Sequence, residues 1–450
     1  MVTDVPDISL IAKYGGAVPR YTSYPTANHF TSAVGPDIHR QWLGELPADE
    51  PVSLYVHVPF CEQLCWYCGC NTSVVRRPEP VRDYLRTLFQ EIALVRRATG
   101  RRVKVTQLHF GGGSPNIIPP DAFVELMKAL TDAFAIGVDA SIAVETDPRS
   151  LTPQWIDAAA GAGVSRMSFG AQDFDPKVQQ AVNRFQPYMT VKCAIDAARA
   201  AGIASINLDL MYGLPHQTVA GVIRSIEAAV DLQPDRIALF GYAHVPWMMS
   251  HQKLIDADSL PGPIERFMQQ EASAEVLAGA GFTRIGFDHF ARPDDSLAQA
   301  AANGTLRRNF QGYTDDAADI LIGLGASSIS MLPDGYVQNN ASVRHWRQNI
   351  EAGRFASARG IRLSAADRAR RAFIEDLLCT LSVDLSALPF ADRIAAGKAL
   401  EEMESDGIIT ANTARLTVTE RGRPFLRAIC SVFDPYFTRK VETPRHSLAV

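Results

Sequence analysis

Apolar and polar positions follow two alternating periods along the middle of the chain, and this pattern predicts strands and helices in turn. Residues 52–60 form a β-branched and aromatic run that is typical of a buried strand. In residues 81–98, apolar side chains recur at three- and four-residue spacings, as they do in an amphipathic helix. The further strands that we expect are 105–110, 141–146, 164–172, 206–215, 236–246 and 283–292. The further helices that we expect are 121–134, one that begins after Thr152, 188–201 and 218–232.

These elements predict an α/β fold. Strands that alternate with helices at this spacing form βαβ units around a parallel sheet. Six or seven such units fit an open or closed (β/α) barrel. In folds of this kind, ligands bind on the loops that follow the carboxyl ends of the strands.

Both ends of the chain depart from the alternating pattern. Residues 1–50 are too polar and too short to fold alone, so we expect them to pack over the barrel. Beyond residue 350 a helix capped by Ser364 is followed by a second helix, a hairpin and a last helix, expected at 364–381, 399–407, 408–422 and 424–433. This order resembles a winged helix. We therefore expect an N-terminal segment, a barrel and a mostly helical, winged-helix-like C-terminal domain, at 1–50, 51–350 and 351–450.

Composition and charge narrow the classes of function. The 450 residues are 47% hydrophobic and 21% charged, as in an ordinary globular protein. A formal net charge of -5 argues against general binding to nucleic acid, whose phosphates need a basic surface. No apolar run approaches the roughly 18 residues of a membrane span, and the N-terminus lacks the features of a secretory signal. We therefore expect a cytoplasmic monomer with no membrane partner.

Cysteines supply the first candidate chemistry. Four of the seven fall within ten residues, at Cys61, Cys65, Cys68 and Cys70. In a reducing compartment such a group indicates metal binding or catalysis rather than disulfides. The spacing alone leaves open a three-cysteine iron–sulfur cluster, a structural zinc ion, and structural or redox thiols. We expect small buried side chains at the three remaining cysteines, Cys193, Cys379 and Cys430.

Other unusual residues lie at the ends of the expected strands. The cysteines follow the first strand, and three consecutive glycines, 111–113, follow the second. Glu145 lies in the third strand, Gln172 ends the fourth and Asp209 lies in the fifth. Glycine backbone lets a ligand approach the main chain closely, and three thiolates leave one iron of a four-iron cluster open. This combination favours a cluster that binds a cofactor held by the glycines.

Short blocks along nearly the whole chain carry a family resemblance. The CxxxCxxC loop after the first strand and the glycine run after the second resemble the radical S-adenosylmethionine superfamily. Further blocks resemble one family within it, the oxygen-independent coproporphyrinogen III oxidases. These blocks are RYTSYPTA (20–27), HVPFCEQLCWYCGCNT (57–72), HFGGGSP (109–115), VETDPR (144–149), FGAQDF (169–174), DLMYGLP (209–215), YAHVP (242–246), GFDHFARPDD (286–295), RNFQGYT (308–314) and GLGASSIS (323–330).

The resemblance implies a set of cofactor ligands. It implies that Cys61, Cys65 and Cys68 bind a 4Fe–4S cluster, whereas Cys70 is an additional cysteine with a catalytic rather than a ligand role. It also implies two molecules of S-adenosylmethionine. The first would contact Tyr55, Gly112, Glu145 and Ile329, with Glu145 also counted as catalytic. The second would contact Tyr67, Gly113, Ser114, Gln172, Arg184, Asp209 and Ala243.

The implied activity is the anaerobic oxidative decarboxylation of two propionates of coproporphyrinogen III to vinyl groups, which gives protoporphyrinogen IX in haem biosynthesis. A 5′-deoxyadenosyl radical would remove a hydrogen from the propionate β-carbon, and the enzyme would need an electron donor for the cluster and a further electron acceptor. Because the substrate carries four propionates, arginines in the family blocks are candidate contacts. The substrate candidates are Arg20, Tyr24, His289, Arg292 and Arg308.

Two alternatives remain beside this interpretation. A haem-binding chaperone of the same superfamily usually lacks the fourth cysteine and the RYTSYPTA segment, and both are present here. A zinc-stabilised winged-helix regulator is the alternative from another class. The chain departs from the family pattern at three positions, with Ser114 for a common Thr, Tyr67 for a common Phe and Gly241 for a frequent Asn.

Overall fold

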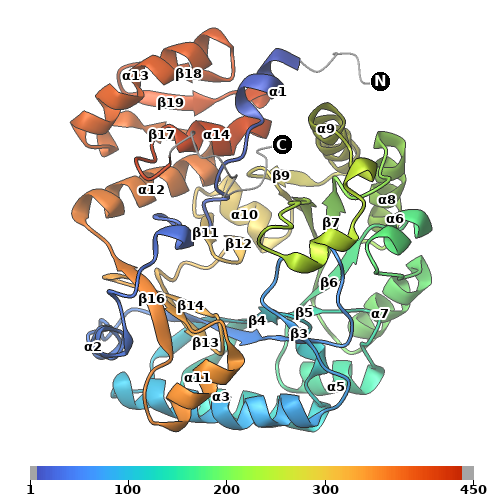
Figure 1. Cartoon of the computed structure of the whole chain (residues 1–450), viewed down its shortest axis with the longest axis vertical. Helices are drawn as coiled ribbons and strands as arrows, with labels where there is room; N and C mark the ends of the chain where they lie inside the picture. The colour runs from blue at the N-terminus through green and yellow to red at the C-terminus, as the bar shows by residue number, and fades with distance from the viewer. Residues whose placement is uncertain (1–7, 438–450) are drawn as a thin grey trace.

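A curved, twelve-stranded sheet forms the centre of the computed structural model, which describes residues 8–437 (Figure 1). Its parallel strands lie side by side in the order β13 (Ile320–Leu324), β1 (Val52–Val58), β4 (Lys104–Gly112), β5 (Ala135–Thr146), β6 (Arg166–Gln172), β7 (Ser205–Tyr212) and β8 (Arg236–Gly241). The helices on its outer face include α3 (Glu79–Ala98), α4 (Pro120–Ala133), α5 (Pro153–Gly161), α7 (Tyr188–Ala200), α8 (Val219–Asp231) and α9 (Pro263–Gly279). This arrangement is the expected partial (β/α) barrel.

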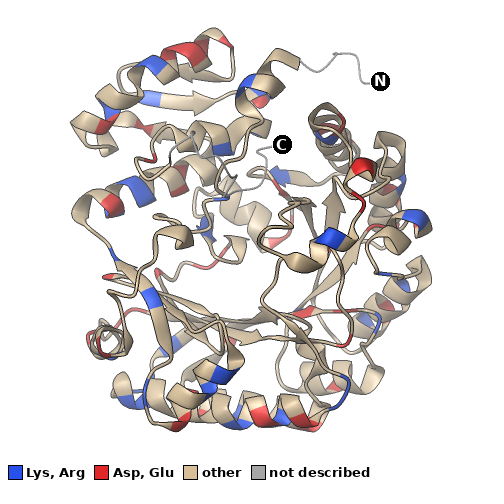
Figure 2. Cartoon of the chain, in the orientation of Figure 1, with Lys and Arg blue, Asp and Glu red and all other residues tan. Residues whose placement is uncertain are grey.

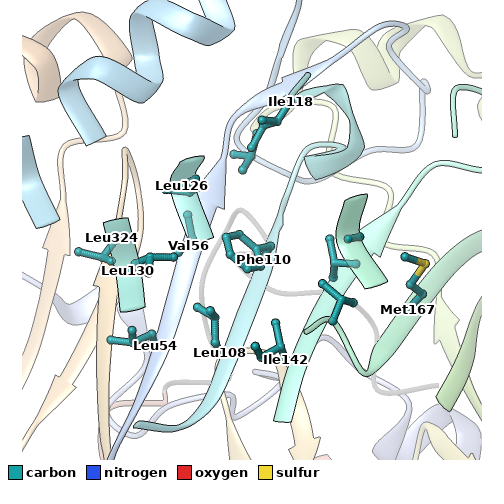
Figure 3. Close-up of a cluster of buried hydrophobic side chains, with 14 of the residues drawn as sticks. Leu54, Val56, Leu108, Phe110, Ile118, Leu126, Leu130, Ile142, Met167 and Leu324 are labelled. Atoms are coloured by element: carbon teal, nitrogen blue, oxygen red, sulfur yellow. The ribbon is translucent and has the colours of Figure 1, made fainter. Parts of the chain in front are cut away.

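The two faces of the sheet differ in chemistry. Alternate residues of β1 and β4, such as Val56 and Phe110, point outward and pack against α4 residues Leu126 and Leu130 (Figure 3). Many of the charged residues lie on the outer helices, such as α3 (Figure 2). Because side chains alternate along a strand, the residues between the apolar ones face the interior of the barrel. The polar interior positions are therefore available for a functional site.

The last expected strand of the barrel is divided in two. Residues 283–292 form a short antiparallel pair, β9 (Thr283–Ile285) and β10 (His289–Ala291), instead of one strand. The chain turns between them at Gly286, whose φ of 55° lies in the left-handed region. The preceding strand, β8, ends at Gly241 rather than at residue 246. The expectation of one long strand at 283–292 was wrong because the turn interrupts an otherwise strand-like run, and the strand expected at 236–246 is shorter than expected.

The other edge of the sheet was not foreseen. Beyond β13 the sheet continues through three antiparallel strands, β14 (Ile329–Leu332), β15 (Gly335–Asn339) and β16 (Ser357–Arg362). They are short; a tight turn joins β14 to β15, and helix α11 (Val343–Glu351) lies between β15 and β16. Helix α2 (Pro36–Gly44) of the N-terminal segment packs against α3 and β16 at this edge.

The C-terminal region is mostly helical and winged-helix-like, as expected. Ser364 caps α12 (Ala365–Thr380) in a capping box with Asp367. Helix α13 (Phe390–Ser405) starts earlier than expected, and α14 (Leu426–Ser431) is shorter. The hairpin, β18 (Ile409–Ala411) and β19 (Arg415–Val418), gains a third strand, β17 (Ser382–Asp384).

One apolar cluster joins this C-terminal region to the rest of the molecule. It contains Leu10 and Tyr14 of α1 (Ile8–Tyr14), Phe287 beside β10, and Ile429 of α14. The N-terminal segment therefore packs against the C-terminal helices as well as the barrel, and the domain boundaries at residues 50 and 350 stay a prediction. Within residues 8–437, no helix combines the length and apolar character needed to cross a membrane.

Candidate active site

The cysteines lie on a loop that follows β1 and is closed at its base. The short strands β2 (Phe60–Cys61) and β3 (Ser73–Val74) pair with each other, and the amide of Val75 donates to the carbonyl of Cys61 at 3.0 Å. Within the loop, the amide of Cys68 donates to the carbonyl of Cys65 at 3.1 Å. Residues 61–74 therefore form one compact loop that presents Cys61, Cys65 and Cys68 beside the carboxyl ends of β1 and β4.

Polar and cationic groups surround the three thiols. Arg184 Nη1 and Arg149 Nη2 donate to Cys65 Sγ at 3.4 and 3.5 Å. Ser114 Oγ donates to Cys61 Sγ at 3.5 Å. The pKa of Cys68 is lowered to about 6, chiefly by its hydrogen bonds with Cys70. Hydrogen bonds and positive charge favour thiolates, which are the ligands that iron and zinc require.

The number of thiols on the loop distinguishes the two kinds of metal site. A structural zinc ion takes four protein ligands in a tetrahedron. Three thiols from one loop instead fit three irons of a four-iron cluster and leave the fourth iron open to another ligand.

A glycine cradle borders the cysteine loop at the end of β4. A Cβ atom at Gly113 would lie 2.3 Å from the carbonyl oxygen of Phe60, so only glycine lets this strand end approach the loop. Gly112 has a φ of 111°, which L side chains rarely adopt. Its amide donates to Glu145 Oε2 at 3.2 Å. The glycines therefore let the end of β4 pack tightly against the cysteine loop, His57 and Glu145.

Glu145 on β5 is held in an ionised form beside this cradle. His109 Nε2 donates to Glu145 Oε1 at 3.0 Å. Burial raises the pKa of Glu145, but the hydrogen bond and charge of His109 outweigh it, so the pKa lies below its usual range. The ring of Tyr55 stacks on His109 with 6.0 Å between centroids, and Ile329 packs in the same cluster as Tyr55. These side chains form a continuous inner wall across β1, β4 and β5.

Asp209 on β7 lies across the barrel interior from this wall. Ser168 Oγ donates to Asp209 Oδ2 at 2.9 Å, and Asn207 Nδ2 donates to Oδ1 at 2.8 Å. Burial and the nearby charge of Glu145 raise the pKa of Asp209 to about 6. A ligand that donates hydrogen bonds or carries positive charge would stabilise this carboxylate.

Arg184 connects the cysteine loop to the end of β6. Its Nη2 donates to the carbonyl of Gly170 at 2.6 Å and forms an ion pair with Asp147 at 3.3 Å. Its buried Nε has no hydrogen-bond partner within the part of the chain that the structure describes. Gln172, which ends β6 with a φ of 66°, lies close to the same guanidinium, and Tyr67 lies near Cys65 and Arg184.

The walls around Glu145 and Asp209 enclose part of a cavity of about 280 Å³ inside the barrel. Glu145 and Asp209 line it together with residues that sequence analysis missed, among them His109, Ser168, Asn207, Phe240 and Gln311. One of the missed residues, Asn207, lies two positions before the predicted Asp209 on β7. The two-residue period of a strand was therefore a signal that pointed to Asn207.

Four of the five substrate candidates lie near the cavity or its rim. His289 lines the cavity, and Arg20 Nη2 donates to the carbonyl of Gly241 at 2.8 Å, just before Ala243. Arg308 and Tyr24 line a small neighbouring pocket. Arg292 lies elsewhere, because its neighbour Ala291 pairs with Arg236 at the amino end of β8, and its guanidinium stacks on Phe282 at 4.4 Å.

The remaining cysteines divide into two kinds. Cys70 is exposed beside the cluster loop, and its amide donates to Cys68 Sγ at 3.4 Å. Cys379 and Cys430 are buried as expected, but Cys193 is exposed on α7. The expectation for Cys193 was wrong because it lies on the solvent side of an amphipathic helix.

Comparisons with known proteins agree with this site. Residues 55–229 match the family model described as the Radical SAM superfamily, and residues 363–425 match the HemN C-terminal domain. The chain is 47% identical over 435 residues to the oxygen-independent coproporphyrinogen III oxidase of Bradyrhizobium diazoefficiens, covering 95% of this chain and 96% of that protein. The chain belongs to the oxygen-independent coproporphyrinogen III oxidase family. The cluster and S-adenosylmethionine are therefore the cofactors of this radical enzyme.

Other members of the family support the same assignment over the full length. The oxygen-independent coproporphyrinogen III oxidase of Escherichia coli is 39% identical over 454 residues, which is 99% of this chain and 98% of that protein. The solved structure of coproporphyrinogen III oxidase (HemN) from Escherichia coli, described as a radical SAM enzyme, superposes with a TM-score of 0.89 at 38% identity. It covers 96% of this chain and 99% of that one.

Proposed function

We propose that this enzyme converts coproporphyrinogen III to protoporphyrinogen IX in haem biosynthesis, by oxidative decarboxylation of two propionates to vinyl groups. The observation that carries the proposal is the convergence of the three-thiol loop, the glycine cradle and Glu145 on one barrel mouth. The relatives that match almost the whole chain bear the corresponding name. No observation favours the haem-binding chaperone or the zinc regulator.

Cys61, Cys65 and Cys68 would hold the cluster. When bound and reduced, the cluster supplies the electron that cleaves S-adenosylmethionine to methionine and a 5′-deoxyadenosyl radical. Arg149 and Arg184 donate to Cys65, so they stabilise negative charge on this side of the cluster. Cys70 would act as a catalytic residue in this proposal, because its thiol hydrogen-bonds with Cys68 and interacts electrostatically with Glu145.

The family resemblance implies two cofactor positions at this barrel mouth. Tyr55, Gly112, Glu145 and Ile329 would bind the first molecule of S-adenosylmethionine, and the ionised Glu145 would accept hydrogen bonds from its amino group. The second molecule would bind beside the first. Its contacts would be Tyr67, Gly113, Ser114, Gln172, Arg184, Asp209 and Ala243. The orphaned Nε of Arg184 supports this assignment, because a carboxylate there would satisfy it.

The substrate would enter above this cavity, with Arg20, Arg308, His289 and Tyr24 at its rim. An electron donor must reduce the cluster, and a second acceptor must take the electron left after carbon dioxide departs. The enclosed barrel interior excludes bulk water from the radical. Binding to nucleic acid or to a membrane is not part of the proposal, and we expect a monomer in the cytoplasm.

Anaerobic reconstitution tests the proposal. Purified protein supplied with iron, sulfide and a reductant should bind about four irons and produce 5′-deoxyadenosine, and coproporphyrinogen III should be converted to protoporphyrinogen IX. A Cys65→Ala variant should lose all three properties, whereas Cys193→Ala, on the exposed face of α7, should keep them. Tight haem binding with no formation of vinyl groups would contradict the proposal.

A further inference from the structure

Four arginines from distant parts of the sequence converge beside the cavity. Arg20 belongs to the N-terminal segment, Arg266 to α9, Arg308 to β11 (Arg307–Asn309) and Arg427 to α14. Arg308 Nη2 donates to the backbone carbonyl of Arg20 at 3.2 Å. The guanidinium carbons of Arg308 and Arg427 lie 4.8 and 5.6 Å from the centroid of the same ring, Phe287. We call these four residues the arginine cluster.

The arginine cluster packs against side chains that line the reaction cavity. Phe240, His289 and Tyr313 line that cavity. The guanidinium of Arg20 lies 5.7 Å from the ring centroid of Phe240, and that of Arg308 lies 4.3 Å from the ring centroid of Tyr313. The cluster therefore borders the aromatic side of the cavity, near the carboxyl ends of β7 and β8.

Like charges are concentrated in this cluster. Arg427 interacts electrostatically with both Arg20 and Arg308, and burial together with these charges lowers the pKa of Arg427 to about 10. Asp288 faces the cluster, but its carboxylate is shared with His289, whose Nδ1 lies 2.6 Å from Oδ1. Glu375 accepts from the backbone amide of Arg308 and from the side chain of Arg307. Buried like charges are costly unless an anion balances them.

Arg308 provides the clearest unsatisfied group. The residue is only 8% exposed, and its Nε and Nη1 have no hydrogen-bond partner among the described residues. A buried guanidinium N–H that lacks an acceptor costs free energy. Nε and Nη1 of Arg308 are donors on opposite sides of one guanidinium, so each could donate to a separate carboxylate oxygen.

The backbone makes room for Arg266. A Cβ at Gly213 would lie 1.9 Å from Arg266 Nη1, and one at Gly241 would lie 3.2 Å from Nη2 and 2.8 Å from the hydroxyl of Tyr212. Gly241 is a position at which the family frequently has Asn. In this chain the missing side chain lets Arg266 and Tyr212 approach the carbonyl that Arg20 uses.

We propose that the arginine cluster is the carboxylate-binding wall of the substrate site, where Arg308 and Arg427, supported by Arg20 and Arg266, hold propionates of the porphyrinogen that are not reacting. This inference rests on the proposed function for the identity of the substrate. It adds Arg266 and Arg427 to the substrate contacts and removes Arg292. Anchoring one edge of the macrocycle in this wall would direct another propionate into the cavity.

Binding of coproporphyrin III, the stable oxidised form with four propionates, tests the proposal without turnover. We would measure the Kd of coproporphyrin III for the reconstituted enzyme by fluorescence titration. The Kd of its tetramethyl ester, which has no free carboxylate, would be measured in the same way. Arg308→Gln and Arg427→Gln should each raise the Kd of the acid about tenfold or more and leave the Kd of the ester nearly unchanged. Arg427→Lys should restore part of the loss, and Arg266→Gln should show a smaller loss.

Arg292→Gln is the matched control, because Arg292 is also stacked on an aromatic ring but lies at the other end of β8. Its Kd for the acid should equal that of the wild type. An unchanged Kd in both Arg308→Gln and Arg427→Gln would overturn the proposal, as would an equal loss for acid and ester. Each variant is also assayed for production of 5′-deoxyadenosine without substrate, which reports on folding and on the radical function. Failure of the proposed function would abolish this product, whereas failure of the arginine-cluster proposal would leave it unchanged.

Discussion

Replacing Asp209 with asparagine should stabilise the cofactor-free protein at pH 8 while weakening its binding of S-adenosylmethionine. The folded protein raises the pKa of Asp209 from 3.8 to about 6, first by burial and then by the charge of Glu145. The folded state therefore binds this proton more tightly than the unfolded chain does. Above pH 6 the ionised carboxylate destabilises the fold, and a neutral amide of the same shape removes that cost.

The magnitude follows from the pKa difference. A difference of about 2 units corresponds to roughly 3 kcal/mol at pH 8. Asparagine can keep one of the hydrogen bonds from Ser168 and Asn207 but not the charge that strengthens both. We therefore expect a net gain of about 1–2 kcal/mol. Because the destabilisation fades as the pH falls through 6 toward 3.8, roughly half of the gain should be lost at pH 5.

Thermal unfolding of the anaerobic, cofactor-free protein at pH 8 and pH 5 measures this effect. Asp139→Asn is the control, because Asp139 is an exposed carboxylate on β5 of the same sheet. Asp209→Asn should raise Tm by a few degrees at pH 8 and by less at pH 5, and it should bind S-adenosylmethionine more weakly than Asp139→Asn does. An unchanged or lower Tm at pH 8 would refute the electrostatic reasoning.

Three further predictions concern single residues. Glu145→Gln should lower the rate of S-adenosylmethionine cleavage at least tenfold with normal iron content, because a charged acceptor becomes a neutral one; equal rates would contradict its assigned role. Gly113→Ala should lower the iron content, because the new Cβ would lie 2.3 Å from the carbonyl oxygen of Phe60; a full cluster would show that the cysteine loop can move. Glu91→Ala should destabilise the protein by about 2–4 kcal/mol in denaturant unfolding without a specific effect on cofactor affinity. The buried Glu91 carboxylate accepts from Gly325, Asn339 and Trp346, which would lose their partner.

Much of the barrel could be predicted because its signals are local. Runs such as 52–60 and 206–215 are apolar enough to indicate buried strands. The glycines at the end of β4 indicate the end of a strand because glycine favours turns. The turn at Gly286 could not be recognised, because the surrounding residues are as strand-like as those of β10. The short strands β14, β15 and β16 carry too few residues to show a period.

The candidate site shows the same division. Glu145 and Asp209 could be found from their positions in predicted strands. Arg266 and Arg427 could not, because only the folded chain brings α9 and α14 to the cavity. Arg292 shows the limit of a family block, since it lies three residues after His289 in the sequence while its guanidinium packs on Phe282 and does not line the cavity.

Transfer of deuterium from substrate to cofactor tests the central claim most directly. Coproporphyrinogen III labelled with deuterium at the β-carbons of its propionates would be incubated anaerobically with the reconstituted enzyme and S-adenosylmethionine. The account predicts protoporphyrinogen IX together with 5′-deoxyadenosine that carries deuterium, because the radical removes hydrogen from that carbon. Two results would contradict this account. In the first, the substrate is converted but the 5′-deoxyadenosine carries no deuterium. In the second, S-adenosylmethionine is cleaved while the labelled coproporphyrinogen III stays intact.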